Sequence, residues 1–279
     1  MQRIFVGDVQ GCADELAELL ARAEREFGRD FELWVVGDLI NRGPENLGPL
    51  RQVRELVEAG RAQYILGNHE ISLLRCWLGL RSVSPFDSFQ DVLDHPTASE
   101  WVDWLRERPL VVTGRLGEQA FAMVHASVHP DWDLAQLEKT ARELEADLAG
   151  ADLADFLGST APRDDRLGRL TRCRSVDAGG AWSSELPEAE PWQPWHAIWG
   201  QGGHDYGVVY GHWALQGLHV GAGLRGLDTG CVHHGRGRDG FLTAWLPDEG
   251  AERPFDVPDE RFWAIPARRA YYAHRDPSA

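Results

Sequence analysis

Five residues that can bind a metal ion each follow a separate predicted strand. They comprise two aspartates, an asparagine and two histidines: Asp8, Asp38, Asn68, His125 and His212. Carboxylate and amide oxygens and imidazole nitrogens together suit a pair of divalent ions such as manganese, iron, cobalt or zinc. Any one of these residues alone is more often a simple turn residue, but five of them at strand ends favour a metal centre. An aspartate shared by two ions holds them roughly 3.5–4 Å apart, as in two-metal hydrolases.

The strands that position these residues alternate with helices in the first third of the chain. Apolar runs at 3–6, 31–36 and 62–66 each end just before one of the candidate ligands. Apolar residues at helical spacing occupy 14–27 and 50–57 between them. Three strand–helix units in a row predict an α/β fold with parallel strands. The carboxyl ends of such strands are where ligands bind.

The remainder of the chain is predicted to hold two helices and four strands: helices at 97–108 and 134–150, and strands at 119–124, 206–210, 223–228 and 241–246. Residues 152–201 show no clean periodicity and are rich in proline, glycine and tryptophan. This segment is too long for a simple loop. We therefore expect one domain over residues 1–279, with a substrate-covering insertion, or cap, at about 152–201.

Composition and charge exclude several classes of protein. The chain has 279 residues, 43% of them hydrophobic and 26% charged, so a packed core is expected rather than disorder. The formal net charge of −16 argues against general affinity for nucleic acids or anionic membranes. An anionic substrate is still compatible with this charge, because bound divalent metal ions supply local positive charge.

Cysteine usage and the amino-terminal residues indicate the cellular compartment. Cys12, Cys76, Cys173 and Cys231 are far apart and form no CxxC pair, which disfavours a disulfide framework or a zinc knuckle. The opening residues, MQRIFVGDVQGC, lack the basic and apolar regions of a secretion signal. No apolar stretch is long enough to cross a bilayer. We expect a cytoplasmic protein with reduced thiols.

The ordered segments GDVQG, GDLINRG, GNHE, VHAS and YGHW resemble the metallophosphatases of the phosphoprotein-phosphatase superfamily. Within it, the chain is most similar to the symmetrical bis(5′-nucleosyl)-tetraphosphatases (the ApaH type), since VHASVHPDWDL, LTRCR, GHWALQGL and LDTGC extend the match over residues 3 to about 246. The resemblance implies a calcineurin-like αββα sandwich. It also implies an enzyme that uses two divalent ions, manganese first and cobalt, iron or zinc as alternatives, to cleave diadenosine tetraphosphate into two ADP.

The resemblance also implies a role for each matched residue. It assigns six residues to the two metal sites, with the second of the two aspartates as the bridge: Asp8, Gln10, Asp38, Asn68, His125 and His212. His69 would be the general acid that protonates the leaving oxygen. Arg42, with Arg172 or Arg174, would hold the phosphoryl oxygens. These roles agree with residue chemistry, because the ordinary pKa of histidine lies near neutrality and guanidinium groups offset developing phosphoryl charge.

Three departures from the superfamily pattern involve four residues. Gln10 stands where histidine is usual, which predicts a weaker first metal site. Asn41 stands where protein phosphatases have an aspartate that partners the acid histidine, which leaves the pKa of His69 open. Ser127 and His129 replace the residues expected in the fourth block, and we expect His129 to lie on the surface.

Other candidate sites are weaker. The segment GAGLRG at 221–226 matches a dinucleotide-binding pattern but precedes a strand, so it is a false positive. His233 and His234 lie in a glycine-rich hairpin, where solvent-exposed turn residues are the better interpretation. For Trp132, stacking on a nucleobase and packing in the core are equally favoured.

Three alternative functions share the same residues. The chain could be a phosphoprotein phosphatase, although Asn41 and the later segments argue against it. It could remove dinucleotide-type caps from RNA 5′ ends, which the same chemistry permits. A nucleotide-binding module that has lost catalysis is the least favoured, because the remaining ligands are all present. The favoured partner is a small-molecule dinucleoside polyphosphate, with neither general nucleic-acid binding nor membrane binding.

Overall fold

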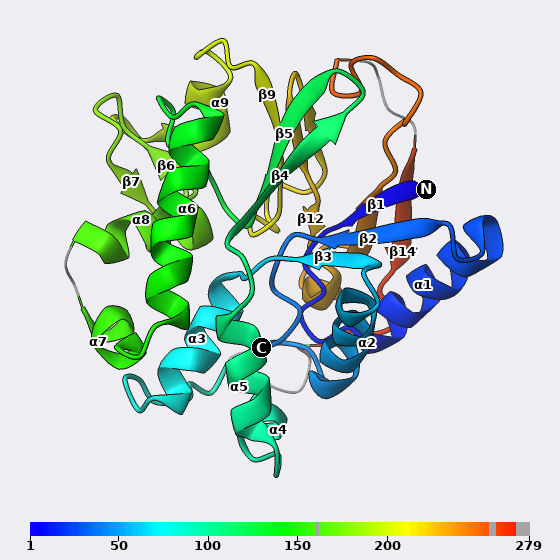
Figure 1. Ribbon diagram of the computed structural model, residues 1–279, viewed down its shortest axis with the longest axis vertical. Helices are drawn as coiled ribbons and strands as arrows, with labels where there is room; N and C mark the ends of the chain where they lie inside the picture. Colours follow the sequence, from blue (N-terminus) through cyan, green and yellow to red (C-terminus); the bar gives the residue numbers. More distant parts are fainter. Residues whose placement is uncertain (160–161, 257–260, 272–279) are drawn as a thin grey trace.

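Two β-sheets pack face to face in the middle of the molecule, with helices on their outer faces (Figure 1). The computed structural model describes residues 1–159, 162–256 and 261–271. Residues 160–161 of the predicted insertion, and residues 257–260 and 272–279 of the predicted single domain, lie outside the described residues. The layered arrangement confirms the predicted αββα sandwich.

The first sheet contains the three predicted parallel strands. Its six strands are β1 (Gln2–Val6), β2 (Phe31–Val35), β3 (Ala62–Tyr64), β12 (Asp228–Thr229), β13 (Phe241–Trp245) and β14 (Phe262–Pro266). β1 pairs in parallel with β2, and β2 with β3, while β13 runs antiparallel to β1. Helices α1 (Ala13–Phe27) and α2 (Leu47–Glu58) cover the outer face of this sheet (Figure 1).

The second sheet has five strands, in the order β10 (His219–Gly221), β11 (Leu224–Gly226), β9 (Tyr206–Tyr210), β5 (Gln119–Val124) and β4 (Val111–Leu116). Helix α6 (Leu134–Ala149) packs against its outer side (Figure 1). The carboxyl ends of β5 and β9, which pair in parallel, bring His125 and His212 to the same edge.

Aromatic side chains fill the space between the two sheets. Phe5 of β1 lies at the centre, with its ring centroid 5.4 Å from that of Phe121 in the second sheet and 5.3 Å from that of Trp245 in the first. The flanking residues Ile4 and Val6 face the opposite way, into the core beneath the helices. Because side chains alternate along a strand, β1 is apolar on both faces. This burial fixes the position of Asp8 directly after it.

The remaining elements lie outside the two large sheets. They are α3 (Asn68–Trp77), α4 (Gln90–Leu93), α5 (Ala98–Arg106), α7 (Leu153–Gly158), α8 (Pro162–Arg172), β6 (Ser175–Val176), β7 (Trp182–Ser183), β8 (Gln193–Pro194), α9 (Trp195–Trp199) and the 3-10 helix η1 (Cys231–His233). Within the predicted insertion, β6, β7 and β8 form a small sheet of their own. Strands of two residues are too short to show an alternating pattern of apolar and polar residues. This is why the sequence did not predict them.

One predicted strand is wrong. Residues 223–228 form two strands: β11 pairs with β9 in the second sheet, and β12 pairs with β13 in the first. The chain crosses between the sheets at Leu227, whose side chain is buried between them. In the sequence, residues on both sides of such a crossing resemble one continuous strand.

Over the described residues, no helix has both the length and the apolar character needed to span a membrane.

Candidate active site

The loops that follow the strands have unusual backbone conformations. Among the described residues, five that are not glycine have positive φ angles, and all five lie at the predicted site: Gln10, Asp38, Asn41, Arg42 and His212. Residues other than glycine rarely have positive φ angles, because each such residue costs about 1–3 kcal/mol of backbone strain. Strain confined to one place indicates that the fold holds these side chains in position for function.

Close backbone packing brings the loops together. A Cβ atom at Gly211 would overlap the Asp8 carboxylate, and one at Gly67 would overlap the Asp38 carboxylate. The His212 backbone N–H donates to Asp8 Oδ1 at 3.1 Å. Glycine is therefore required where the loops after β9 and β3 approach the two aspartates.

Three of the predicted metal ligands already have their ligand atoms gathered. One oxygen of Asp38 and one nitrogen each of His125 and His212 lie within 4.8 Å of one another. His125 Nε2 is 3.1 Å from Asn68 Oδ1 and 3.4 Å from Asp38 Oδ2. This mixture of carboxylate, amide and imidazole suits a divalent ion.

Hydrogen bonds to the backbone orient both histidines. His125 Nδ1 is 2.9 Å from the Val36 carbonyl oxygen, and His212 Nε2 is 3.0 Å from the Arg172 carbonyl oxygen. A carbonyl oxygen only accepts, so these nitrogens carry the hydrogen. The other ring nitrogen, Nε2 of His125 and Nδ1 of His212, is left with a lone pair for a metal ion.

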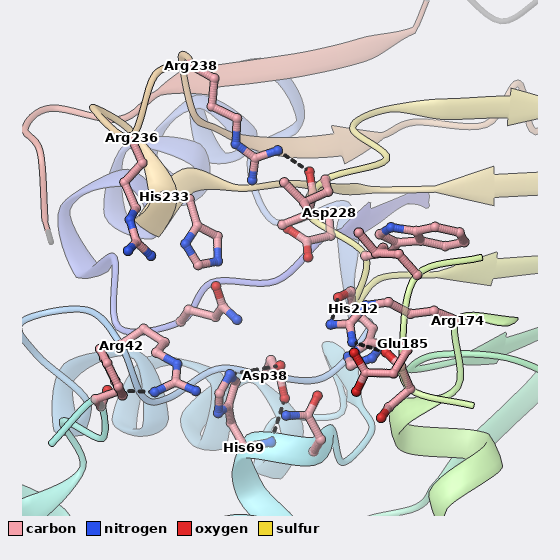
Figure 2. Close-up of a pocket in the computed structure, with 18 residues that line it drawn as sticks. Asp38, Arg42, His69, Arg174, Glu185, His212, Asp228, His233, Arg236 and Arg238 are labelled. Atoms are coloured by element: carbon pink, nitrogen blue, oxygen red, sulfur yellow. Dashed lines mark hydrogen bonds and ion pairs between the residues drawn. The ribbon is translucent and has the colours of Figure 1, made fainter. Parts of the chain in front are cut away.

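Asp228 is a site residue that the sequence interpretation missed. It lies at the start of β12, and its carboxylate faces the cleft near Asp38 and His212 (Figure 2). Burial, together with Asp228 and Asp38, holds the pKa of Asp8 well above its ordinary range. Burial and Asp38 likewise raise the pKa of Asp228 to about 6. The signal available in the sequence was its position in the segment LDTGC, at the end of the predicted strand 223–228.

The carboxylate cluster fits a bound cation. Asp228 Oδ2 is buried and has no hydrogen-bond partner among the residues that the structure describes. An unpaired buried carboxylate oxygen is costly unless a cation or a proton offsets its charge. Gln10 is also among the residues that line the cleft. The buried carboxylates, with the histidines and the amide oxygens, form a donor set that fits divalent metal ions.

His69 is held in one tautomer by Asn41. The Asn41 side-chain oxygen accepts backbone N–H groups from Arg42 and Ser88, both at 2.8 Å. Its amide nitrogen therefore donates, to Asp87 at 2.9 Å and to His69 Nδ1 at 2.8 Å. The proton of neutral His69 thus lies on Nε2. Burial and the positive charge of Arg42 lower the pKa of His69 to about 4, although Asp38 acts in the opposite direction.

Glu70 fixes the loop that carries Asp38. Its two carboxylate oxygens accept backbone N–H groups from Asp38, Leu39 and Gly67 at 2.8–3.0 Å. Burial and the nearby charge of Asp38 raise the pKa of Glu70 to about 7. The side chain of this residue, the last of the segment GNHE, connects the loops after β2 and β3 by accepting hydrogen bonds from their backbone N–H groups.

The site opens into a cleft of about 730 Å³. Four arginines line it: Arg42, Arg174, Arg236 and Arg238. Arg42 and Arg174, two of the predicted phosphate-binding residues, are thus brought together in the cleft, and their role there stays a prediction. Arg172, the last residue of α8, is not among the residues that line the cleft: it lines a neighbouring cavity and lies over the Trp182 ring. Of the predicted pair, Arg174 is therefore the one that we carry into the proposed function.

Two further expectations concerning histidine are settled. His233 lines the cleft and points into it (Figure 2), so its assignment as an exposed turn residue is wrong. The hairpin folds back over the site, a long-range effect that local turn composition does not reveal. His234 does serve the turn, accepting the Gly240 backbone N–H at 3.2 Å. His129 is half-buried and does not line the cleft.

Trp132 and the glycine-rich segment have structural roles. The Trp132 ring stacks on His129 with centroids 5.3 Å apart and packs against the main core, outside the cleft. Packing is therefore the interpretation that fits. The segment 221–226 forms part of the β10–β11 hairpin, which confirms that no helix follows it.

Comparison with known proteins identifies the class. Residues 1–170 match the sequence profile described as calcineurin-like phosphoesterase. This region holds the three parallel strands of the first sheet and most of the candidate metal ligands. The fold and the site therefore define a calcineurin-like metallophosphoesterase, a metal-dependent hydrolase.

Curated relatives narrow the family. The chain is 37% identical over 256 residues to a protein of Escherichia coli O1:K1 named bis(5′-nucleosyl)-tetraphosphatase, symmetrical, and the match covers 84% of this chain and 89% of that protein. A Shigella boydii protein of the same name is also 37% identical, with 90% of its length covered. The chain belongs to the family of symmetrical bis(5′-nucleosyl)-tetraphosphatases.

Solved structures share the fold at lower identity. A structure provisionally described as a diadenosine tetraphosphatase superposes with a TM-score of 0.61 at 24% identity, covering 95% of this chain and 93% of that one. A protein serine/threonine phosphatase from Saccharomyces cerevisiae superposes with a TM-score of 0.52 at 13% identity, covering 96% and 79%. These likenesses establish the fold.

Proposed function

We propose that this protein hydrolyses diadenosine tetraphosphate symmetrically to two ADP, as a cytoplasmic enzyme with manganese as its metal. The activity named for the curated relatives supports this substrate. The observation that carries the proposal is one cleft in which a buried carboxylate cluster lies beside four arginines. Such a cleft provides both a metal site and counter-charges for a polyphosphate chain. Arg174 and Glu185, from the predicted insertion, form part of its wall, which supports a role for that segment in substrate binding.

The residues divide the chemical tasks among them. The six predicted ligands, with Asp228, would hold divalent ions, which supply an activated water molecule and neutralise phosphoryl oxygens when bound. Arg42 and Arg174 would hold the oxygens of the attacked phosphoryl group. His69 Nε2–H would donate to the oxygen of the leaving group.

The first experiment uses metal-stripped protein with diadenosine tetraphosphate, with and without manganese, and separates the products by ion exchange. We expect metal-dependent formation of ADP alone. Asp38→Asn and His69→Asn, prepared in parallel, should reduce turnover and so exclude a contaminating hydrolase. AMP and ATP as the main products would refute symmetrical cleavage.

A phosphopeptide and a dinucleotide-capped RNA are compared in the same assay. Turnover of the phosphopeptide without turnover of the dinucleotide would support a protein phosphatase, with which this chain shares its fold. Cleavage confined to capped RNA would instead move the substrate to nucleic-acid ends. Dinucleotide that binds but survives intact would indicate a lapsed enzyme.

A further inference from the structure

Exposed apolar side chains lie on the wall of the cleft. Among the described residues, the large ones that line it are Phe86, Leu186 and Leu215, which are 47%, 38% and 68% exposed. Single exposed apolar residues are common on protein surfaces, but three that share one cleft with candidate metal ligands indicate a binding surface. Because Trp132 packs outside the cleft, a nucleobase bound in the cleft has to contact residues such as these.

Phe86 lies beside one of the predicted phosphate-binding arginines. Its backbone carbonyl accepts a hydrogen bond from Arg42 Nη1 at 2.7 Å. The Asn41 side chain binds both of the residues that follow: its NH₂ group donates to the Asp87 carboxylate at 2.9 Å, and its oxygen accepts the Ser88 backbone N–H at 2.8 Å. The backbone of Phe86 is therefore fixed at the site, while its ring remains half-exposed in the cleft.

Leu186 and Leu215 belong to two segments that meet at the other predicted phosphate-binding arginine. Arg174 Nη1 donates to the Ser184 carbonyl at 2.7 Å, two residues before Leu186. Its Nη2 lies 3.4 Å from the His212 carbonyl, three residues before Leu215. The guanidinium group thus holds the insertion against the loop after β9, and each segment contributes one exposed leucine to the same cleft.

A hydrogen-bonded turn fixes the backbone around Leu215. The Gln216 backbone N–H donates to the Trp213 carbonyl at 2.9 Å. The Gln216 side-chain oxygen accepts from the Tyr210 hydroxyl at 3.0 Å, which attaches the turn to the end of β9. The most exposed of the three side chains is therefore carried on a turn that the second sheet holds in place.

The order of these groups across the cleft matches a dinucleotide. Figure 2 shows Arg42 and Arg174 on opposite sides of the cleft, with Asp38 and His69 at its base. Exposed apolar side chains therefore accompany the arginine on each side, and metal ligands lie between them. A dinucleoside tetraphosphate has the same order, with a flat base at each end of an anionic chain.

We propose that the cleft contains two nucleobase subsites, one at Phe86 and the other at Leu186 and Leu215. The face of the Phe86 ring stacks on one base, and the two leucines pack against the other. The assignment to the bases of diadenosine tetraphosphate rests on the proposed function, whereas the affinity for a dinucleotide does not.

Direct binding to the manganese-loaded protein tests the subsites. The probe is diadenosine tetraphosphate with a methylene group in place of its central bridging oxygen, which blocks symmetrical cleavage. Inorganic tripolyphosphate is the comparison ligand, because it has no base. In isothermal titration calorimetry at a fixed free manganese concentration, Phe86→Ala should weaken binding of the analogue about tenfold and leave that of tripolyphosphate unchanged. Phe86→Trp should retain most of the affinity, because it keeps a flat aromatic face.

A double variant tests whether the two subsites are separate. Leu215→Ser should weaken binding of the analogue severalfold, because it removes apolar surface from one base. In Phe86→Ala combined with Leu215→Ser, the two losses should multiply, since the side chains contact different bases. A combined loss no larger than the greater single loss would place both side chains on one base and overturn the pair of subsites.

Trp77→Ala and Leu218→Ser are the matched controls, since each removes an exposed apolar side chain that is not among those lining the cleft. Phe86 and Leu215 are exposed as well, so their replacement should leave the fold intact, which the melting temperature checks. Unchanged analogue affinity in Phe86→Ala, or an equal loss in Trp77→Ala, would overturn the Phe86 subsite. A wild type that bound the analogue no more tightly than tripolyphosphate would overturn both subsites.

Kinetics separate the subsites from the proposed function. Phe86→Ala should raise KM for diadenosine tetraphosphate about tenfold with little change in kcat, because the base contact is the same in the substrate complex and in the transition state. Dinucleotide turnover that Phe86→Ala left unaffected would overturn its subsite while leaving the proposed function intact. Failure of the wild type to cleave the dinucleotide, with analogue binding still sensitive to Phe86→Ala, would reject the proposed function and support the subsites.

Discussion

The pKa of His69 matters because it is the candidate proton donor. With a pKa of about 4, its imidazole is neutral at pH 7 and is a weak acid at Nε2. A phosphate leaving group has a second ionisation near pH 6 and so departs readily as an anion. Phenol, with a pKa of about 10 like that of the tyrosine side chain, needs more assistance. A hydrogen bond from neutral His69 is thus better matched to phosphoanhydrides than to phenyl or alkyl esters.

His69→Asn should therefore affect substrates unequally. We expect kcat to fall about 10²-fold or more on phenyl phosphate, within the range of general acid catalysis. On diadenosine tetraphosphate we expect a loss of only about tenfold, below that range, because its leaving group needs less assistance. Steady-state kinetics with manganese on the two substrates provide the measurement. An equal loss on both would contradict a role that depends on the leaving group.

Exchanging the groups around His69 should change its protonation. In Asn41→Asp combined with Asp87→Asn, an amide and a carboxylate trade places, so the hydrogen bond between these positions is retained. A carboxylate at position 41 can accept from His69 Nδ1 and stabilises the imidazolium, which raises the pKa. The protonated donor then exists below the new pKa and is lost above it. We expect kcat on phenyl phosphate to rise near pH 6 and to gain an alkaline limb, whereas superimposable wild-type and variant pH profiles would contradict this account.

At the scale of elements, Glu70 connects the loops after β2 and β3. In Glu70→Gln, one acceptor becomes an NH₂ group that faces backbone N–H donors. A buried donor without an acceptor costs about 1–3 kcal/mol. We expect the free energy of unfolding to fall by that amount in urea, with a larger proportional loss of turnover, because the Asp38 loop shifts. Leu56→Ala on α2, outside the site, is a control that should lower stability and leave kcat unchanged.

The elements also show which features could be predicted from sequence. Asp8, Asp38 and Asn68 follow buried strands whose apolar runs are continuous, so strand ends and ligands were visible together. Asp228 was missed because the chain crosses between sheets just before it, which hid the start of β12. His233 was misassigned because its side chain reaches the cleft through a hairpin that folds back over the site. Arg172 and Arg174 differ only in the direction of the chain after α8, which a spacing of two residues does not determine.

At the scale of the whole molecule, metal binding couples to pH. Asp8 and Asp228 have raised pKa values, and that of Asp228 is about 6, so the folded metal-free protein retains protons that the unfolded chain has lost. Stability from these two groups is therefore complete at low pH and is lost as the pH rises through their folded pKa values. A bound metal ion displaces these protons and offsets the repulsion. Metal ions should thus stabilise the fold more at pH 8 than at pH 5.

The difference in melting temperature between manganese-loaded and metal-free protein measures this coupling. We expect this difference to widen steadily from pH 5 to pH 8, because protons compete less with the metal ion for the carboxylates as the pH rises. For scale, a metal ion present at 100 times its Kd adds about 2.7 kcal/mol to the free energy of unfolding. Calorimetry in buffers of different ionisation enthalpy should detect proton release at pH 6. Asp228→Asn should reduce that release and weaken manganese binding about 10- to 100-fold, as loss of a ligand or its supporting group does. A difference that stayed constant with pH, or an Asp228→Asn protein with unchanged affinity, would remove Asp228 from the metal site.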